Sequence, residues 1–370
     1  MKILIVKLSS LGDVVHAMPA VQDLAQAFPH AQIDWVVERG FAPLVRRCKG
    51  VHRVIPCELR RWRKNIFYAE TRKAWQLFKD DLRQDEYDAV IDLQGLTKSA
   101  LVSWMARLSH FGKRYAMANQ TAGSSYEAPT RWVAHTAIAL PQHSHAVSRS
   151  RDLCALAFGY SLPTVVSYGL VAQMDKALEA IKYVALKTGS RGVVALVHGT
   201  SRTDKKWPLA HWRELATRLN TSGFGVVVLH GSDAEEQVSH EMVQGHRHAQ
   251  IWPRMALDAL TDSLAHCVGV VGVDSGLSHI GVALNLAHVQ IYNFDTAWRT
   301  GPLAPAEPVL QAPMPPLVPG VPTVSMLRQQ MAETAATSTV RQVAVFAQPT
   351  PSVDQVWQAW ERVSVGLVSR

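Results

Sequence analysis

At two places in the chain the pattern of a strand is followed by a turn and then by a helix. This repetition limits the fold more than any other feature. Residues 2–8 have the pattern of a buried strand, and 14–28 follow with apolar residues at helical spacing. A second strand pattern covers 192–197, and after a polar loop a helical pattern covers 209–219. Such openings are typical of doubly wound parallel sheets. We therefore predict an α/β protein with two Rossmann-like domains.

Other short patterns support the same organisation, because a chain of 370 residues exceeds what one core usually supports. We place the domain boundary near Ala172, which gives an N-terminal domain over 1–172 and a second domain over 173–350. The last segment, 351–370, is predicted to be a helix that packs back on the N-terminal domain. Further strands are expected over 32–37, 89–93, 225–230, 267–273 and 288–292, and further helices over 42–47, 97–108 and 277–286.

Charge and composition narrow the possible partners. The formal charge of +8 favours an anionic partner, which is nucleic acid, an anionic lipid surface or a phosphorylated substrate. The four cysteines lack CxxC spacing, so we expect neither a zinc site nor a disulfide framework. No apolar run approaches the ~20 residues that span a bilayer. We expect a cytoplasmic protein whose membrane contact, where it exists, is peripheral.

Asp13 follows the first predicted strand, at the edge where open α/β sheets bind their ligands. A general base at this position is geometrically sensible. The alternative is that Asp13 caps the helix that follows, a common use of Asp. The spacing alone leaves both interpretations open.

Two loops of the second half suit a phosphate ligand. The loop 198–208 is rich in hydroxyls and cations, although it also fits a solvated connection. At 273–279 a strand, a turn and a helix follow one another, so the amides of Gly276 and Leu277 are expected to point at phosphate oxygens. Asp274 would orient a hydroxyl or cap the helix, and His279 is either a phosphate donor or a structural residue.

A basic run at Arg60, Arg61 and Arg63 suits phosphate or carboxylate recognition. A solvated face and a nucleic-acid site are the alternatives. No helix-turn-helix, RNP or zinc-finger pattern accompanies the run. We therefore favour an acidic small substrate or a lipid headgroup over nucleic acid.

The sequence resembles the lipopolysaccharide heptosyltransferase I family in four segments, which occur in the same order and spacing. They are the opening 7–20, the Arg60 run, the Thr200 loop and the Asp274 turn. The resemblance implies two facing Rossmann-like domains of the GT-B architecture. It implies inverting transfer of L-glycero-D-manno-heptose from ADP-heptose to Kdo of Kdo2-lipid A, in assembly of the lipopolysaccharide inner core. The enzyme would work on the cytoplasmic face of the inner membrane, against its anionic surface. No DxD motif is present, which agrees with a reaction without metal or cofactor.

The resemblance also assigns roles by position. Asp13 corresponds to the catalytic base, with Ser10 and Gly12 shaping the loop around it, and the Arg60, Arg61 and Arg63 run lies in the half that holds the acceptor. Glu235 is chosen over its neighbour Glu236 as a ribose contact. The residues that correspond to the donor site are Thr200, Ser201, Lys205, Glu235, Met255, Asp274, Gly276, Leu277 and His279.

Three features depart from the family pattern. Ser201 stands where a second Thr is common, residues 292–296 replace a Gly-rich turn, and eight prolines crowd into 302–322. We interpret the proline-rich segment as a surface loop.

Three other functions compete with this interpretation. A nicotinamide-dependent oxidoreductase is disfavoured because 8–13 lacks GxGxxG. A noncatalytic protein that binds anionic ligands, and a related heptosyltransferase with a different core acceptor, both stay open.

Overall fold

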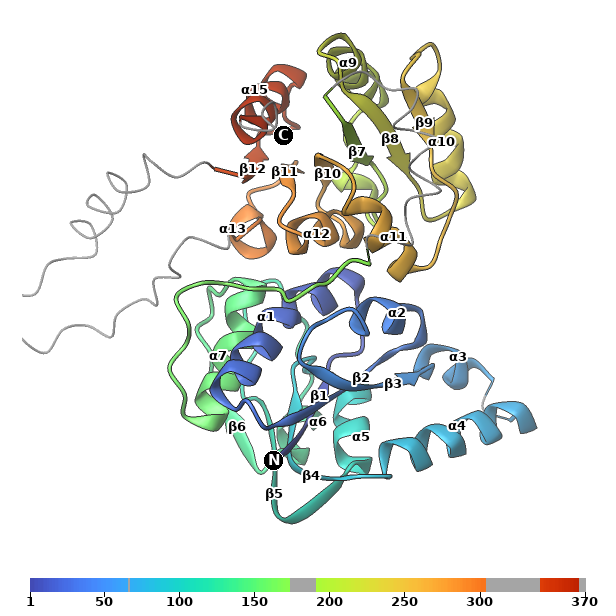
Figure 1. Cartoon of the computed structure of the whole chain (residues 1–370). Coiled ribbons are helices and arrows are strands. Elements are labelled where there is room, and N and C mark those ends of the chain that lie inside the picture. Colours follow the sequence, from blue (N-terminus) through green and yellow to red (C-terminus); the bar gives the residue numbers. More distant parts are fainter. Residues whose placement is uncertain (66, 174–190, 304–339, 366–370) are drawn as a thin grey trace, which may run out of the picture.

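The computed structural model describes residues 1–65, 67–173, 191–303 and 340–365, which form two parallel six-stranded sheets with helices on both faces (Figure 1). The predicted α/β class with two Rossmann-like domains is confirmed. The predicted boundary near Ala172 adjoins residues 174–190, which lie outside the described residues. Most of the proline-rich segment, from residue 304 onward, also lies outside them.

The first sheet has the strand order β3-β2-β1-β4-β5-β6, and each adjacent pair is parallel. Its strands are β1 (Lys2–Val6), β2 (Gln32–Glu38), β3 (Val51–Cys57), β4 (Glu86–Asp92), β5 (Arg107–Met117) and β6 (Thr136–Ile138). Its helices are α1 (Leu11–Ala27), η1 (Arg39–Phe41), α2 (Ala42–Val45), α3 (Leu59–Lys64), α4 (Ala69–Leu82), α5 (Thr97–Met105), α6 (Pro129–Val133) and α7 (Ala146–Phe158).

The second sheet repeats this order, as β12-β11-β10-β7-β8-β9, again with parallel pairs. Its strands are β7 (Val193–Val197), β8 (Gly225–Leu229), β9 (Ala249–Ile251), β10 (Gly269–Val273), β11 (Ala287–Tyr292) and β12 (Gln342–Phe346). Its helices are η2 (Thr203–Lys205), α9 (Leu209–Thr221), α10 (Asp233–Val243), α11 (Leu257–Leu264), α12 (Gly276–Ala283), α13 (Ala297–Thr300) and α15 (Val353–Ser364).

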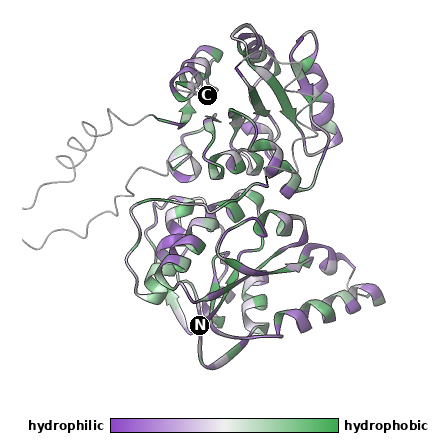
Figure 2. Ribbon diagram, in the orientation of Figure 1, coloured by the Kyte–Doolittle hydropathy of each residue, from purple (hydrophilic) through white to green (hydrophobic). Residues whose placement is uncertain are grey.

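The central strands are buried on both faces, which is why they read as continuous apolar runs (Figure 2). Ile3 and Ile5 of β1 pack in one cluster with α1 and α7, while Leu4 and Val6 pack in another with residues of α4 and α5. Successive strand residues point to opposite faces of a sheet. Helices α4 and α5 therefore cover one face of the first sheet, and α1 and α7 cover the other.

Each sheet reverses its winding direction between its first and fourth strands, namely between β1 and β4 and between β7 and β10. Ligands of open α/β sheets bind beyond the carboxyl ends of the strands at such a switch point. Asp13 lies in the first turn of α1, directly after the loop that follows β1, and the loops after β7 and β10 carry Thr200 and Asp274. Helices α1 and α12, which follow β1 and β10, contact each other, so the two switch points face one another.

Two predicted elements differ from the structure. The helix expected over 97–108 ends at Met105, because the chain turns there into β5, whose many charged residues hid its strand pattern. The last helix, α15, packs on β11, β12 and α9 of the second sheet, and its predicted packing on the N-terminal domain is wrong. The apolar stripe of α15 fits that sheet, where Trp360 is fully buried against Phe224.

Candidate active site

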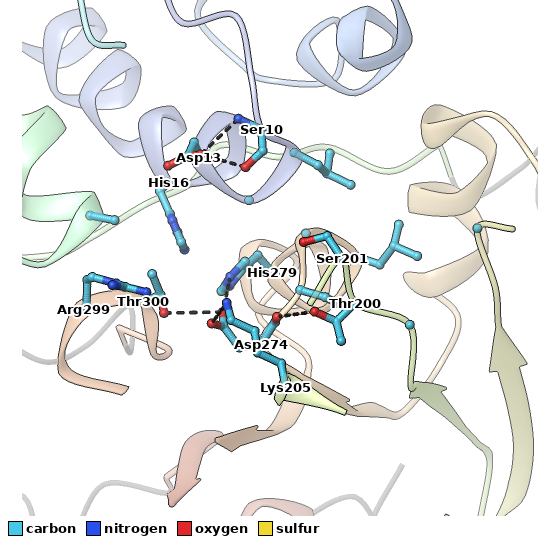
Figure 3. Close-up of a pocket in the computed structure, with 18 of the residues that line it drawn as sticks. Ser10, Asp13, His16, Thr200, Ser201, Lys205, Asp274, His279, Arg299 and Thr300 are labelled. Carbon is cyan, nitrogen blue, oxygen red and sulfur yellow. Dashed lines mark hydrogen bonds and ion pairs between the residues drawn. The ribbon is translucent and has the colours of Figure 1, made fainter. Parts of the chain in front are cut away.

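A pocket of about 530 Å³ lies between the two domains, bounded by α1 on one side and by the loops after β7 and β10 on the other (Figure 3). Side chains from both halves of the chain therefore share one cavity. Most of the residues predicted from the sequence line it, namely Ser10, Gly12, Asp13, Thr200, Ser201, Lys205, Glu235, Asp274, Gly276, Leu277 and His279.

Asp13 occupies the third position of α1 and both caps the helix and faces the pocket. Its Oδ2 accepts hydrogen bonds from the Ser10 amide at 3.0 Å and the Ser10 hydroxyl at 2.7 Å. The side chain is 38% exposed, and this surface opens into the cavity. The two interpretations of Asp13 left open by the sequence are thus compatible.

Lys7 supplies the charge that keeps Asp13 ionised. Burial opposes ionisation of Asp13, but the charge of Lys7 and the hydrogen bonds from Ser10 outweigh it and lower the carboxyl pKa. Burial also lowers the pKa of Lys7 to about 8, although Asp13 counteracts this effect. Lys7 donates to the Leu93 carbonyl at 2.9 Å, which fixes the ammonium beneath the loop.

On the opposite wall, Asp274 binds Lys205, whose Nζ lies 2.6 Å from Oδ2. The other carboxylate oxygen lies 3.4 Å from both His279 Nε2 and the Thr300 hydroxyl. Burial alone would raise the pKa of Asp274, but His279 and Lys205 hold it well below its usual range. The N-cap of α12 is Ser275, so the expected capping role of Asp274 is wrong. Asp274 instead positions the ammonium of Lys205.

Two glycines let the domains approach each other at the pocket. A Cβ on Gly276 would lie 2.6 Å from Leu11 Cβ, and one on Gly12 would lie 2.9 Å from His279 Cδ2. The buried His279 ring meets His16 edge to face, with centroids 4.2 Å apart. His279 therefore belongs to the packed contact between domains as well as to the pocket lining.

Glu235 lies in the pocket, and its neighbour Glu236 does not line it. The Glu235 carboxylate accepts from the Gly231 amide at 2.6 Å. Gly199 makes room for it, since a Cβ there would lie 2.6 Å from the Glu235 carboxyl carbon. Met255 lines an adjoining hollow of about 160 Å³ with Leu277, next to the main pocket.

Among the described residues, one of the three predicted arginines contacts the loop between β1 and α1. Arg60 Nη2 lies 3.4 Å from Ser9 Oγ, beside Lys98 Nζ at 2.9 Å from the same oxygen. Arg61 pairs with Glu58 instead, and Arg63 is exposed on α3. Helix α3 turns Arg61 by about 100° from Arg60, whereas Arg60 and Arg63 are three residues apart and neighbour each other on the helix surface.

Further charged and polar groups that the sequence did not single out also line the pocket, Arg149, Arg299 and Thr300 among them. Arg149 comes from α7, is almost fully buried and donates to the Thr121 hydroxyl at 3.2 Å. Arg299 and Thr300 come from α13, next to the departure from the family pattern. No local pattern marks them, because only the packing of α7 and α13 brings them to the cavity.

Neither a metal-binding group nor a membrane-spanning helix occurs in the described parts of the chain. Among those residues, three or more His, Cys, Asp or Glu side chains do not gather as they would around a metal ion. Within the same ranges, no helix has the length and apolar character needed to cross a bilayer.

Two Rossmann-like domains that face each other across a cleft, with a carboxylate on one wall and a cation and hydroxyls on the other, define a glycosyltransferase of the GT-B class. The sequence model of glycosyltransferase family 9 (heptosyltransferase) matches residues 75–318. The chain belongs to this family, which confirms the resemblance found in the sequence.

Individual relatives agree with the family match. The chain is 38% identical over 292 residues to lipopolysaccharide heptosyltransferase 1 of Escherichia coli K12, covering 79% of this chain and 88% of the relative. The structure of E. coli heptosyltransferase WaaC with ADP is similar, with a TM-score of 0.71, 32% identity, and coverage of 90% of this chain and all of that chain. WaaC with ADP-2-deoxy-2-fluoro heptose gives a TM-score of 0.67 at the same identity and coverage.

Proposed function

We propose that the protein transfers L-glycero-D-manno-heptose from ADP-heptose to a Kdo residue of Kdo2-lipid A, with inversion at the anomeric carbon. The observation that carries this proposal is the pairing of an ionised carboxylate, Asp13, with the Lys205 and Asp274 wall across one cavity (Figure 3). Membership of family 9 supports the class of sugar that is transferred.

The donor lies against the second domain in this proposal. The similar WaaC structures hold ADP and an ADP-heptose analogue, which supports an ADP-sugar as donor. Thr200, Ser201 and Lys205 stand where hydroxyls and a cation would hold the diphosphate, and the amides of Gly276 and Leu277 begin α12. Glu235 is placed to accept ribose hydroxyls, and Met255 lines the adjoining apolar hollow that suits the base.

Asp13 acts as general base in the transfer step. The acceptor hydroxyl attacks the anomeric carbon from the face opposite the diphosphate, and its proton passes to Asp13. The bond between that carbon and the diphosphate oxygen breaks, and ADP leaves with the electron pair. Lys205 and the amides near Gly276 stabilise the negative charge that grows on the leaving group. A single displacement of this kind inverts the configuration.

The acceptor approaches from the first domain. Arg60 and Lys98 converge on Ser9, beside the loop that holds Asp13, and both suit the carboxylate and phosphate groups of Kdo2-lipid A. Arg61 and Arg63 are exposed on the same short helix and would attract the acceptor at longer range. Since that acceptor is a lipid, we place the enzyme in peripheral contact with the anionic cytoplasmic face of the inner membrane.

Incubation with ADP-heptose and Kdo2-lipid A, followed by mass spectrometry, tests the proposal. The expected product is one heptose heavier than the acceptor, and ADP is released in equal amount. Lipid A without Kdo should give no product. Transfer only to an already heptosylated core would identify a related heptosyltransferase with a different acceptor, and no transfer to any core acceptor would refute the activity.

A further inference from the structure

The side of the first domain formed by α4, α5, α6 and the start of β5 exposes large apolar side chains. Trp104 of α5 is 64% exposed, Trp132 of α6 is 77% exposed, and Leu77 of α4 and Leu101 of α5 are also exposed. Helix α4 alternates hydrophilic and hydrophobic residues along its length (Figure 2). Contiguous exposed apolar residues on a soluble domain mark an interaction site.

A bulge in β5, just after Arg107 and Leu108, exposes another aromatic residue. Leu108 pairs with Tyr87 and Lys113 pairs with Ala89, so residues 109–112 fall outside the ladder between β4 and β5. Phe111, within that bulge, is 86% exposed. The irregular backbone thus leaves an aromatic ring exposed to solvent.

Between α4, α5 and β5 lies a hollow of about 650 Å³, lined by apolar side chains and by four cations that we call its basic rim. Trp75, Leu101, Trp104 and Leu108 supply apolar lining. The cations at its rim are Lys79, Arg83, Arg107 and Arg114.

The rim carries a surplus of positive charge. Arg107 pairs with Glu86. Arg114 donates only to the carbonyls of Ser103, Trp104 and Ala106, at the end of α5. In the ranges that the structure describes, no carboxylate forms an ion pair with Lys79, Arg83 or Arg114. Aromatic rings next to uncompensated cations suit the headgroup region of an anionic bilayer, where rings insert and cations meet phosphates.

Helix α5 connects this side to the active site. Lys98, near its first turn, contacts Ser9, while Leu101 and Trp104 follow three and six residues later. These positions share one side of the helix, and the rise of 1.5 Å per residue separates Lys98 from Trp104 by about 9 Å along the axis. The apolar tail of a molecule whose polar head binds at Ser9 could therefore extend along α5 and contact the hollow.

We propose that the α4, α5 and β5 side of the first domain docks on an anionic lipid bilayer, with Trp104, Leu101 and Phe111 entering the headgroup region and Lys79 and Arg83 binding lipid phosphates. The inference rests on the proposed function, because only a lipid-borne acceptor requires the enzyme to sit on a membrane. The inference goes beyond that function because it assigns the membrane contact to one side of the molecule. Lys98, which contacts Ser9 together with Arg60, lies in the first turn of helix α5, which forms part of this side.

Co-sedimentation of the full chain with vesicles tests the docking side without any substrate. The wild type should bind vesicles of phosphatidylglycerol and phosphatidylcholine and should bind pure phosphatidylcholine far less. The partition coefficient should fall by roughly tenfold or more in each of two double variants, Leu101→Ser/Trp104→Ser and Lys79→Glu/Arg83→Glu. At high salt the charge variant should bind as well as the wild type, because salt screens the lost attraction.

Matched controls separate docking from general damage. Leu156→Ser removes a similarly exposed leucine from α7, on the other face of the sheet, and Arg46→Glu/Lys49→Glu reverses two exposed charges at and after the end of α2. These controls should bind vesicles like the wild type, and thermal melting checks that every variant is folded. Equal binding by the docking variants and the controls would overturn the proposal.

Activity assays distinguish failure of this inference from failure of the proposed function. With a short Kdo-bearing acceptor that lacks acyl chains, the docking variants should turn over like the wild type. With Kdo2-lipid A in vesicles, their acceptor KM should rise roughly tenfold, in step with weaker binding. If the wild-type protein binds vesicles but transfers no heptose, the proposed activity is refuted and the proposed docking side is not.

Discussion

Lys7 Nζ lies 4.0 Å from Asp13 Oδ1, so a buried ammonium stands directly behind the carboxylate that faces the cleft. The lysine is 3% exposed, whereas the carboxylate opens to the pocket. The loop after β1 and the first turn of α1 thus supply a carboxylate, which we propose as the base, and the charge that keeps it ionised. Within the first domain, this pair is the feature that most directly couples the fold to the chemistry.

The first prediction concerns pH. Lys7 lowers the pKa of Asp13, so activity should persist down to lower pH in the wild type than without that charge. Lys7→Met raises the Asp13 pKa and should shift the acidic limb of kcat/KM to higher pH. Lys2→Met, at the exposed start of the same strand, should leave the limb in place. An unchanged limb in Lys7→Met would show that Lys7 does not control the ionisation of Asp13.

The second prediction concerns the diphosphate. Lys205→Ala should lower kcat/KM for the donor by roughly 10²-fold and weaken ADP binding, because the cation acts on both the bound diphosphate and the leaving group. The neighbouring Lys206 is exposed and forms no side-chain contact with Asp274, so Lys206→Ala is the matched control. Calorimetric titration with ADP and donor kinetics measure both effects. Equal behaviour of the two variants would refute the loop assignment.

The third prediction concerns the acceptor. Arg60→Gln should raise the acceptor KM by roughly tenfold, as expected for a lost charge-assisted contact, with little change in donor KM. Arg63→Gln removes the same charge from the same helix, and since the described structure gives the contact with Ser9 to Arg60, this variant should have a smaller effect. The measurement is steady-state kinetics with each substrate varied separately at two salt concentrations. A larger change in donor KM than in acceptor KM for Arg60→Gln would contradict this role.

The fourth prediction concerns the contact between domains. Gly276→Ala places a Cβ against Leu11, so the domains must separate or the side chain must move. We expect a loss of about 1–3 kcal/mol in unfolding free energy or a matching loss of donor affinity. Gly40→Ala, where a Cβ meets nothing within 4 Å, is the control. Denaturant titration together with ADP binding measures both quantities, and a fully neutral Gly276→Ala would argue against close domain contact.

The sequence could predict most of the fold because the signal was local. The strands at 2–8 and 192–197 are continuous apolar runs, and each is followed by a helix with its own periodicity. Strand β5, by contrast, is interrupted by Arg107, Lys113 and Arg114 and has no such run. The packing of α15 could not be predicted either, since an apolar stripe does not specify which domain covers it.

The site was predictable where the residues sit on strand-to-helix loops. Asp274 belongs to such a loop, Lys205 ends the short helix η2 within another, and Asp13 lies in the first turn of the helix after a third. The parallel topology brings these strand ends together. Arg149 and Arg299 reach the same pocket from α7 and α13, and only tertiary packing determines their positions. Within the described residues, only Arg60 of the arginine run contacts Ser9, and Arg61 pairs with Glu58; an acceptor role for the run stays a prediction.

The most direct test of the account is the turnover of Asp13→Asn with ADP-heptose and Kdo2-lipid A. The amide can still accept the hydrogen bonds from Ser10, so helix α1, thermal stability and ADP affinity should be nearly unchanged. The carboxylate that receives the acceptor proton is gone, and turnover should fall by roughly 10²–10⁴-fold. Turnover close to the wild-type value in a folded variant that binds ADP would show that Asp13 only caps its helix, and it would contradict the mechanism.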